Sequence, residues 1–466
     1  MKAPTGAQAG NLRWWGDPRA GGRVLTGDHL LEVPLDPLDP VDPLDLRRED
    51  PTIRVYAREV RAPDLVDEDL PYLLFLQGGP GGRSPRPGAD GPGWLAWALR
   101  RYRVVLLDQR GTGLSTRQDR HALRGLDPAA TAERLAHFRA DAIVQDAEAL
   151  RRHLLGDEPW TVLGQSFGGF CVWTYLSFAP QGLRAAYVTG GIPPVGVHLD
   201  DVYRATRRAV DRRTAELDED HPEARAVLAD VARHLLDGAD ERLPTGERLT
   251  VGRLQEVGHV LGSAGGPDLV ARLAEDAWAA PYRRLSDTFL TDVAAQVSYA
   301  TAPLYAVLHE ACCGEPGVVT AWSSDRVRAA EGPPREPVDG LLPLTGENVY
   351  RDSVRADPAL LPMADVADLL AERRWDRPLY HRDRLAANTV PVVACVYERD
   401  MYVDPGLSRA TAETTGSVTV VDDADHHHDG LRRNGPEILG RLEEALAEVA
   451  PDAVAPARPE PVGGDA

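Results

Sequence analysis

Short apolar segments alternate with helix-like segments in this chain, and this alternation limits its possible folds more than any other feature. Each apolar segment is four to eight residues long and ends at glycine, aspartate or a polar turn; they span 71–77, 102–108, 160–165, 184–190, 390–397 and 417–421. Such runs predict strands buried on both faces of a parallel sheet. Helix-like stretches, including 128–155 and 168–179, lie between them. The pattern therefore predicts an α/β protein with a doubly wound, mostly parallel sheet.

The alternation stops near residue 195 and resumes near residue 388, in a chain of 466 residues that is too long for one minimal core. The intervening segment is rich in Ala, Arg, Leu and Glu, with helical periodicity in 201–217 and 222–239. Because ligands bind beyond the carboxyl ends of the strands in open α/β folds, we expect this segment to cap that edge.

The expected organisation has four parts. They are a first part of the α/β core (1–194), a largely helical cap (195–387), a second part of the core (388–450) and a disordered tail (451–466). The core is expected to begin with a strand near 53–60, after an Asp- and Pro-rich turn region at 33–45.

Charge and composition exclude several classes of protein. The net charge of −20 argues against a nucleic-acid partner, because a phosphate backbone would be repelled. The first residues contain no apolar signal-peptide core, and no long uncharged apolar run follows, so neither a signal peptide nor a membrane span is expected. The four cysteines (Cys171, Cys312, Cys313 and Cys395) show no disulfide or metal-site spacing, which favours reduced thiols in a cytoplasmic protein.

A candidate nucleophile follows the apolar run at 160–163. Residues 164–168 read Gly-Gln-Ser-Phe-Gly and lead into an apolar helix-like segment, which is the G-x-S-x-G arrangement in its strand–turn–helix context. Small flanking residues let the backbone turn sharply, and the serine then lies at a helix N-terminus that favours developing negative charge. A chance match in a glycine-rich chain is the alternative, but it does not explain the strand and the helix. Ser166 is the candidate nucleophile.

An oxyanion hole beside this serine needs two backbone N–H donors. One is expected from Phe167, directly after the nucleophile, and the other from a loop that follows an earlier strand. Residues 77–82, Gln-Gly-Gly-Pro-Gly-Gly, follow such a strand, and Gly79 is the candidate donor. A flexible turn without function is the alternative.

The acid of a serine triad in this topology should follow the strand at 390–397, where Glu398, Asp400 and Asp404 compete. Asp404 precedes Pro405 and a helix-like segment, so a helix N-cap explains it without catalysis. Glu398 is too close to the strand end. Asp400 lies within the loop and is the candidate acid.

Three consecutive histidines, His426, His427 and His428, follow the last strand, where the base of such a triad belongs. Spacing alone does not separate them. A metal cluster is not expected, because consecutive loop side chains point in different directions and lack helical i, i+4 spacing. No cofactor is expected either, since a serine triad needs none.

These and further motifs occur in a characteristic order. They are QGGPG at 77–81, DQRGTGLST at 108–116, GQSFGG at 164–169, LHEA at 308–311, TGENVY at 345–350, ERDMYVD at 398–404 and HDGLR at 428–432. Together they resemble the longer branch of the proline iminopeptidases (prolyl aminopeptidases), serine hydrolases of the α/β-hydrolase fold. The similarity covers roughly residues 25 to 445 and is weakest near 200–290. Gln77 departs from the more familiar pattern, which has histidine there; since the oxyanion donor is a backbone group, we expect little catalytic consequence.

The resemblance implies a triad of Ser166, Asp400 and His428, and it selects His428 among the three histidines. It also implies that Glu310 and Glu347 hold the free amino end of a short peptide, preferentially at an N-terminal proline. A buried carboxylate pair suits an ammonium group, although a surface or helix-end position would explain each glutamate without substrate.

Two rival functions remain open on the same residues. An esterase, lactonase or amidase would use the same triad without needing Glu310 or Glu347. A binding protein that kept only the fold would be expected to have lost a triad residue, and none is missing. A dehalogenase or epoxide hydrolase would need aspartate in place of Ser166. No expectation of oligomeric state follows from the sequence.

Overall fold

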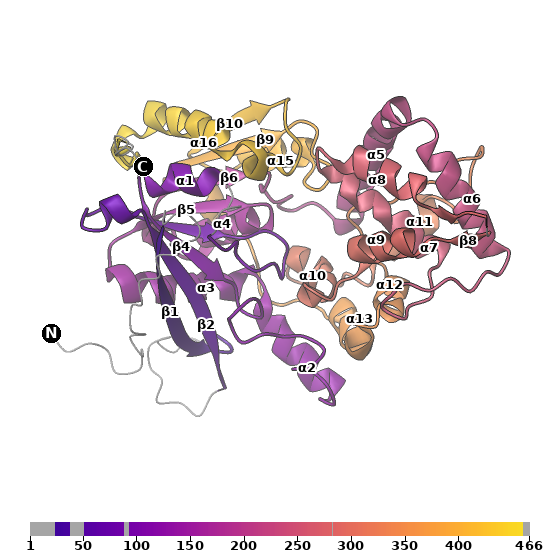
Figure 1. Cartoon of the computed structure of the whole chain (residues 1–466). Coiled ribbons are helices and arrows are strands. Elements are labelled where there is room, and N and C mark those ends of the chain that lie inside the picture. Colours follow the sequence, from indigo (N-terminus) through magenta and orange to yellow (C-terminus); the bar gives the residue numbers. More distant parts are fainter. Residues whose placement is uncertain (1–23, 38–50, 88–92, 282, 460–466) are drawn as a thin grey trace.

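The computed structural model describes residues 24–37, 51–87, 93–281 and 283–459 (Figure 1). Within these residues an eight-stranded sheet has the strand order β1-β2-β4-β3-β5-β6-β9-β10. The strands are β1 (Leu25–Pro34), β2 (Thr52–Arg61), β3 (Tyr72–Leu76), β4 (Arg103–Asp108), β5 (Trp160–Gln165), β6 (Leu183–Thr189), β9 (Val392–Tyr397) and β10 (Val418–Asp423). All neighbouring strands from β4 to β10 are parallel, whereas β2 is antiparallel to both of its neighbours, β1 and β4. The predicted doubly wound, mostly parallel sheet is confirmed.

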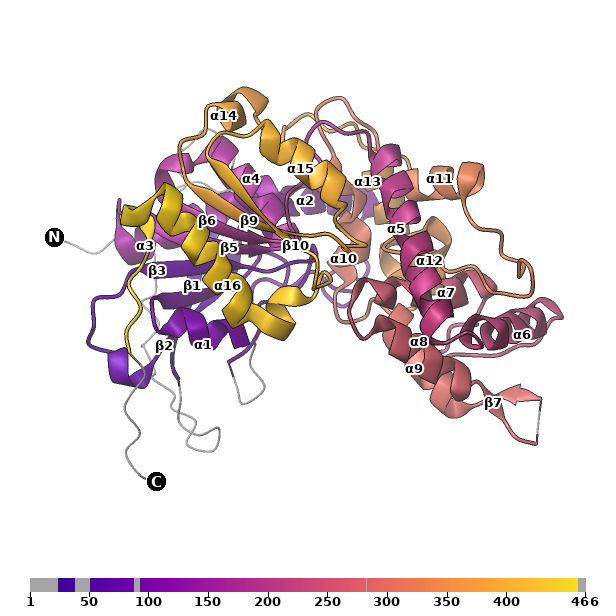
Figure 2. The ribbon, with the colours of Figure 1, turned by 90° about the horizontal axis from the view of Figure 1, so that it is seen from above.

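Helices cover both faces of this sheet (Figure 2). One face packs against α1 (Gly93–Leu99) and α16 (Gly430–Val449), and the other against α3 (Ala140–Leu155), α4 (Phe167–Phe178), α14 (Arg382–Ala386) and α15 (Pro405–Glu413). Alternate residues of a strand serve opposite layers: Leu73 and Phe75 join the α1–α16 side, and Leu74 and Leu76 join the α3–α4 side. This double burial is why the strands read as unbroken apolar runs.

Two local features differ from expectation. Strand β1 was not predicted; it pairs antiparallel with β2 at the edge of the sheet and alternates between buried and less buried residues. The predicted helix at 128–155 is divided into α2 (Pro128–Leu135), a short 3-10 helix (Ala136–Phe138) and α3. The break occurs where Arg110 Nη1 donates to the His137 carbonyl oxygen at 2.7 Å. Most of the turn region expected at 33–45 lies outside the described residues.

The chain between β6 and β9 is mainly helical. Besides α14, its α-helices are α5 (Leu199–Asp220), α6 (Ala224–Leu236), α7 (Val251–Gln255), α8 (Gly266–Glu275), α9 (Asp287–Val297), α10 (Pro303–Leu308), α11 (Ser323–Glu331), α12 (Arg351–Ala356) and α13 (Ala364–Glu372). Two short strands, β7 (Trp278–Ala279) and β8 (Arg284–Leu285), pair as a hairpin. The 3-10 helices of the described chain outside 136–138 are Pro63–Leu65, Pro180–Gly182, Glu256–Gly262, Glu310–Cys313, Leu361–Met363 and Pro451–Ala453.

This helical region contributes to two apolar clusters. Residues of α5 to α9, such as Leu254 and Phe289, form a cluster of their own, and these helices lie beside the sheet as a separate lobe (Figure 1). Residues of α10 and α13, such as Leu304 and Leu370, instead join the cluster that contains one face of the sheet. The segment 195–387, expected as one cap, therefore packs partly as its own lobe and partly as an extension of the core.

The expectation of a disordered tail from residue 451 is wrong for residues 451–459. Pro451–Ala453 form a 3-10 helix, and Ala455 is buried in the cluster on the α1–α16 face. Backbone pairing secures the end of this segment, since Arg458 N–H donates to the Arg100 carbonyl oxygen at 2.8 Å. Residues 460–466 lie outside the described part. In the described ranges, no helix combines the length and the apolar character that a membrane crossing requires.

Candidate active site

Ser166 occupies a sharp turn between β5 and α4. Its backbone has φ +55° and ψ −126°, a conformation that costs energy for any residue with a side chain. The turn is fixed by a hydrogen bond from Ser166 N–H to the Thr189 carbonyl oxygen (3.0 Å). A Cβ atom at Gly168 would overlap the Leu76 carbonyl oxygen. The motif glycine is therefore required by the close approach of a neighbouring strand.

The loop after β3 lies directly against this turn. A Cβ atom at Gly78 would lie 2.8 Å from Ser166 Cβ, so only glycine permits the approach. Gly79, Phe167 and Ser166 line the same cavity. Within the described residues, neither the Gly79 nor the Phe167 amide N–H donates a hydrogen bond. Both predicted oxyanion donors are thus beside the serine with their amides unengaged.

Asp400 and His428 form a buried pair. Asp400 Oδ2 accepts a hydrogen bond from His428 Nδ1 at 2.7 Å, and Oδ1 accepts from the N–H groups of Tyr402 (2.8 Å) and Val403 (3.0 Å). Since a carboxylate only accepts, the imidazole is held as the tautomer with hydrogen on Nδ1. This leaves Nε2 free to accept a proton. The edge of the Tyr402 ring packs on the imidazole, with 4.8 Å between centroids.

The charge state of His428 depends on its neighbours. Burial alone would lower its pKa, but Asp400 first and Glu347 next outweigh this and raise the pKa above the usual range. Glu347 is itself buried, which raises the pKa of its carboxyl group. Tyr305 donates its hydroxyl hydrogen to Glu347 Oε1 at 2.7 Å. The imidazolium form is therefore favoured by two carboxylates.

His428 contacts the turn that carries Ser166. His428 Nε2 lies 3.5 Å from Nε2 of Gln165, the residue that precedes the serine. Among the described residues, the Ser166 hydroxyl makes no hydrogen bond. Bonds between nucleophile and base are often long before substrate binds, so this arrangement is compatible with a triad.

A cavity of about 80 Å³ lies over Ser166 and is walled by both parts of the chain. Its apolar lining includes Phe170 and Ile192 from the sheet side, with Leu199 and Val202 from α5. Two carboxylates, Glu347 and Asp404, line this cavity, and Glu347 is the one of them that was expected to bind a free amino end. The site therefore joins the candidate nucleophile, an apolar chamber and acidic side chains.

Glu310 has a different position. It is buried but does not line the cavity, whereas its neighbours His309 and Cys313 do. Glu310 Oε1 accepts a hydrogen bond from Ser324 N–H at 2.9 Å, at the start of α11. Oε2 is buried and has no hydrogen-bond partner among the described residues, and burial raises the pKa of this carboxyl group. The contact with the start of α11 accounts for Oε1 of this carboxylate but not for Oε2.

The two competing acids have other tasks. Asp404 caps α15, accepting a hydrogen bond from Leu407 N–H at 3.0 Å, as its position before a proline predicts. Glu398 is half exposed and lies 3.8 Å from Arg409. Neither contacts His428 in the described structure.

The three histidines have three different environments. His426 Nδ1 lies 3.1 Å from both oxygens of Asp423. His427 is buried, and burial followed by Arg213 and Arg399 lowers its pKa to about 4. His428 alone meets Asp400. No group of three or more potential metal ligands is present among the described residues.

Two residues of the site, Tyr402 and Tyr305, were not predicted from the sequence. Tyr402 lies in the loop of Asp400, so its position near the candidate acid was predictable from the sequence, but its packing on the His428 imidazole was not. Tyr305 lies 42 positions before Glu347, and nothing in the sequence connects them.

The sequence is similar to those of known proteins along most of the chain. Residues 71–431 match the family described as the alpha/beta hydrolase fold. The chain therefore belongs to the α/β-hydrolase fold family.

Individual relatives narrow the assignment. A proline iminopeptidase of Aeromonas sobria is 42% identical over 415 residues, which cover 89% of this chain and 95% of the relative. A proline iminopeptidase of Aspergillus aculeatus is 31% identical over 436 residues, covering 90% and 93%. A solved structure of a proline iminopeptidase from Mycobacterium smegmatis is 16% identical with a TM-score of 0.41, covering 86% and 97%. Within its fold family the chain belongs to the proline iminopeptidases, as its motifs predicted.

Proposed function

We propose that this protein is a serine aminopeptidase that releases an N-terminal residue, preferentially proline, from short peptides. The observation that carries the proposal is the cavity that Ser166 shares with the Glu347 carboxylate. One group attacks a carbonyl carbon, and the other suits the ammonium of the same residue. The names of the relatives support the preference for proline.

In the proposed first step His428 Nε2 accepts the hydroxyl proton of Ser166 while Oγ attacks the carbonyl carbon of the N-terminal residue. Asp400 holds the imidazole and stabilises its charged form, which the short 2.7 Å hydrogen bond supports. The carbonyl oxygen becomes an oxyanion between the N–H groups of Gly79 and Phe167.

In the second half the intermediate collapses and the C–N bond breaks. The leaving amine takes the proton from His428, so a free peptide departs and the first residue remains as an ester on Ser166. Water then attacks this ester with His428 as base, releasing the free amino acid and restoring the serine. No metal or redox partner is needed for this balance.

Glu347 is proposed to bind the substrate's ammonium group. Its Oε1 accepts from Tyr305, and an ammonium on the other oxygen would offset the cost of burying the charge. Glu310 is proposed to act in the same recognition, supported by its unpartnered buried Oε2 but not by any contact with the cavity. Of the two carboxylates, Glu347 has the stronger support.

The proposed location and partners rest on the cysteines and on the net charge of the chain. We propose a cytoplasmic location, supported by four cysteines that are all free thiols. The acidic chain argues against nucleic acid as a partner.

The decisive experiment compares three naphthylamides: prolyl, alanyl and N-acetyl-prolyl. Wild type is expected to cleave the prolyl substrate fastest and the acetylated one not at all, because acetylation removes the ammonium that Glu347 would bind. Equal cleavage of the blocked substrate would instead indicate an esterase- or amidase-like enzyme with the same triad.

The matched variants are Ser166→Ala and Glu347→Gln. Ser166→Ala should remove turnover of every substrate, and wild-type turnover by the pure variant would overturn the triad. Glu347→Gln should lose turnover of the prolyl naphthylamide selectively and should still hydrolyse a neutral ester. A protein that kept the fold without chemistry would cleave nothing in any of these assays.

A further inference from the structure

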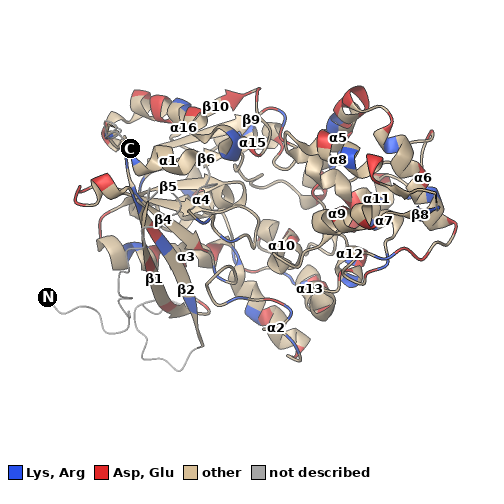
Figure 3. Cartoon of the chain, in the orientation of Figure 1, with Lys and Arg blue, Asp and Glu red and all other residues tan. Residues whose placement is uncertain are grey.

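A second cavity, of about 290 Å³, lies between α5 and α11 and has no part in the proposed reaction. Four of its lining residues are arginines, from α5 (Arg204, Arg207 and Arg208) and α11 (Arg328), and Glu331 is the single acidic lining residue. The chain as a whole carries a net charge of −20. The sequence of α5 mixes acidic and basic residues, whose positions are coloured on the ribbon in Figure 3, so the cationic lining is a local feature of one side of this helix.

Two of these arginines are neutralised within the protein. Arg204 bonds to Asp201 and Glu331, both at 2.8 Å. Arg328 donates to Asp325 at 2.8 Å, lies 3.3 Å from Asp352, and stacks 3.8 Å over the centre of the Tyr350 ring. These two side chains build the wall and leave little charge for a ligand.

The other two arginines have spare capacity. Arg207 uses Nε on Asp211 at 3.2 Å, but its Nη1 is buried and has no hydrogen-bond partner among the described residues. Arg208 is exposed and makes no hydrogen bond or ion pair with any described residue. A buried guanidinium nitrogen without an acceptor is costly, and an anionic oxygen is the group that relieves the cost.

The rest of the lining is largely apolar. It includes Val210, Val327, Leu344 and the ring of Tyr350. An inorganic anion would leave this surface unused, whereas an organic anion would cover it with its hydrocarbon part.

This cavity adjoins the one over Ser166. Tyr203 lines both, and its hydroxyl is buried without a partner in the described structure. Gly346 and Asn348, on either side of Glu347, line the second cavity as well. A ligand there would lie behind the carboxylate proposed to hold the substrate's ammonium.

We propose that this second cavity binds a small organic carboxylate, with the carboxylate on Arg207 and Arg208 and its apolar part against Val210, Val327 and Leu344. A planar carboxylate matches the paired N–H donors of a guanidinium. The inference concerns binding and is independent of the proposed peptidase reaction.

Calorimetric titration of the full-length protein tests this with three probes: N-acetyl-leucine, N-acetyl-leucinamide and inorganic phosphate. The free acid is expected to bind about ten-fold more tightly than the amide, the size expected when charged hydrogen bonds are lost. The double variant Arg207→Ala, Arg208→Ala should lose about the same factor. Arg212→Ala, an exposed arginine of the same helix that lines neither cavity, is the control and should bind like wild type.

The other outcomes overturn the inference. Equal binding of acid and amide would mean that the cavity does not recognise a carboxylate. Equal or tighter binding of phosphate would mean that the apolar lining does not contribute to binding. Unchanged binding by the double variant would place the ligand elsewhere. If the alanine variant does not fold, the pair Arg207→Gln, Arg208→Gln keeps most of the side-chain volume and should show the same loss. Because the readout is binding, its failure is distinguishable from failure of the peptidase assay.

Discussion

At the scale of single residues, Glu347 has two predicted effects, on the substrate and on the base. Its carboxylate is among the causes that raise the pKa of His428. The proposed reaction needs neutral His428, so kcat/KM should fall on the acid side as pH drops through this raised pKa. Glu347→Gln removes a negative charge, lowers the pKa of His428, and should move the acidic limb to lower pH.

The measurement is the pH profile of p-nitrophenyl acetate hydrolysis, because a neutral ester needs no ammonium site. Glu310→Gln is the matched control, since Glu310 is not among the causes that shift His428. Its profile should coincide with wild type. An acidic limb that stays in place in Glu347→Gln would contradict the proposed coupling.

The histidine run gives a second prediction at this scale. His428→Ala should lower kcat/KM for prolyl naphthylamide by about 10⁴-fold or more, as loss of a triad base does elsewhere. His426→Ala removes contacts with Asp423 and Asn434, neither of which belongs to the proposed triad, and should stay within about two-fold of wild type. Thermal unfolding of both variants checks that the fold survives. Comparable losses of kcat/KM in the two variants would contradict the assignment of His428 alone as the base.

At the scale of elements, the turn between β5 and α4 depends on glycine for steric reasons. Gly168→Ala would drive a Cβ into the backbone of β3 at Leu76, and overpacking of this kind costs about 1–3 kcal/mol. We expect a lower melting temperature together with a lower kcat, because Ser166 must shift with the turn. Gly440→Ala in α16 is the control. Its Cβ meets nothing within 4 Å, so the better helix former should stabilise the protein by about 0.5–1 kcal/mol.

The elements also show what the sequence could predict. Strands β3, β4, β5, β6 and β9 were predictable because burial on both faces leaves an unbroken apolar run. Strand β10, at the edge of the sheet, is only partly buried but was predictable from its run of β-branched residues. Strand β1 was not, since an edge strand keeps polar residues such as Asp28 and Glu32 among its apolar ones. The break between α2 and α3 depends on Arg110, a long-range contact with no local signal. A long-range contact also explains the position of Glu310. It was expected in the cavity, but its carboxylate instead accepts a hydrogen bond from Ser324 N–H at the start of α11.

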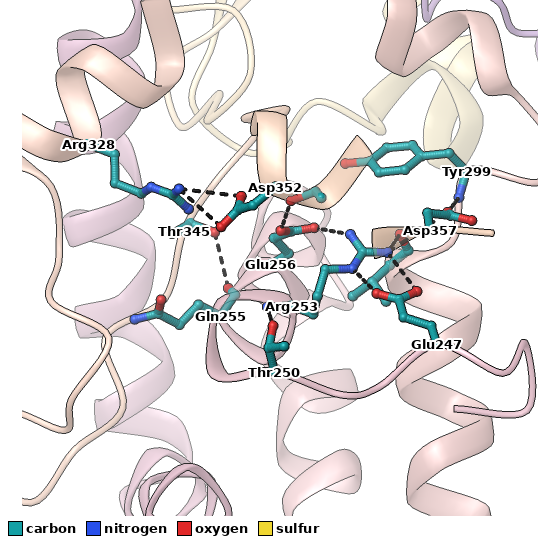
Figure 4. Close-up of polar contacts among 12 residues, drawn as sticks. Glu247, Thr250, Arg253, Gln255, Glu256, Tyr299, Arg328, Thr345, Asp352 and Asp357 are labelled. Atoms are coloured by element: carbon teal, nitrogen blue, oxygen red, sulfur yellow. Dashed lines mark hydrogen bonds and ion pairs between the residues drawn. The ribbon is translucent and has the colours of Figure 1, made fainter. Parts of the chain in front are cut away.

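At the scale of the whole molecule, a buried ionic network joins the two apolar clusters of the helical region. Arg253 bonds to Glu247 at 2.6 Å, to Glu256, and to the Val297 carbonyl oxygen at 2.7 Å, and it lies 3.8 Å from Asp357 (Figure 4). The flanking residues Leu254 and Val257 belong to the lobe of α5 to α9. Val354 and Leu360, on either side of Asp357, belong to the cluster shared with the sheet. The network thus couples the lobe to the core on which the active site is built.

The network also makes stability depend on pH. It places three carboxylates around one guanidinium, and burial raises the pKa of Glu256 to about 7, against 4.5 ordinarily. Between these two values the unfolded chain has lost the Glu256 proton while the folded chain keeps it. The folded state therefore binds more protons, so the free energy of unfolding falls as pH rises through this window. The full contribution is about 3 kcal/mol at most, from the difference between the two values.

Glu256→Gln isolates this effect, because it keeps the side-chain shape while removing the titration. Its amide oxygen can accept from Arg253, and its amide N–H can donate to the Ser353 hydroxyl oxygen. Urea unfolding at a series of pH values from 4 to 8 gives the two stability curves. Relative to the variant, wild type should lose stability steadily from about pH 4.5 to about pH 7 and then run parallel to it. Ser286→Ala, at the exposed start of α9, removes a helix cap and should lower stability equally at every pH. A constant difference between wild type and Glu256→Gln would mean that Glu256 has the same pKa in the folded and unfolded protein, and would contradict the proposed effect.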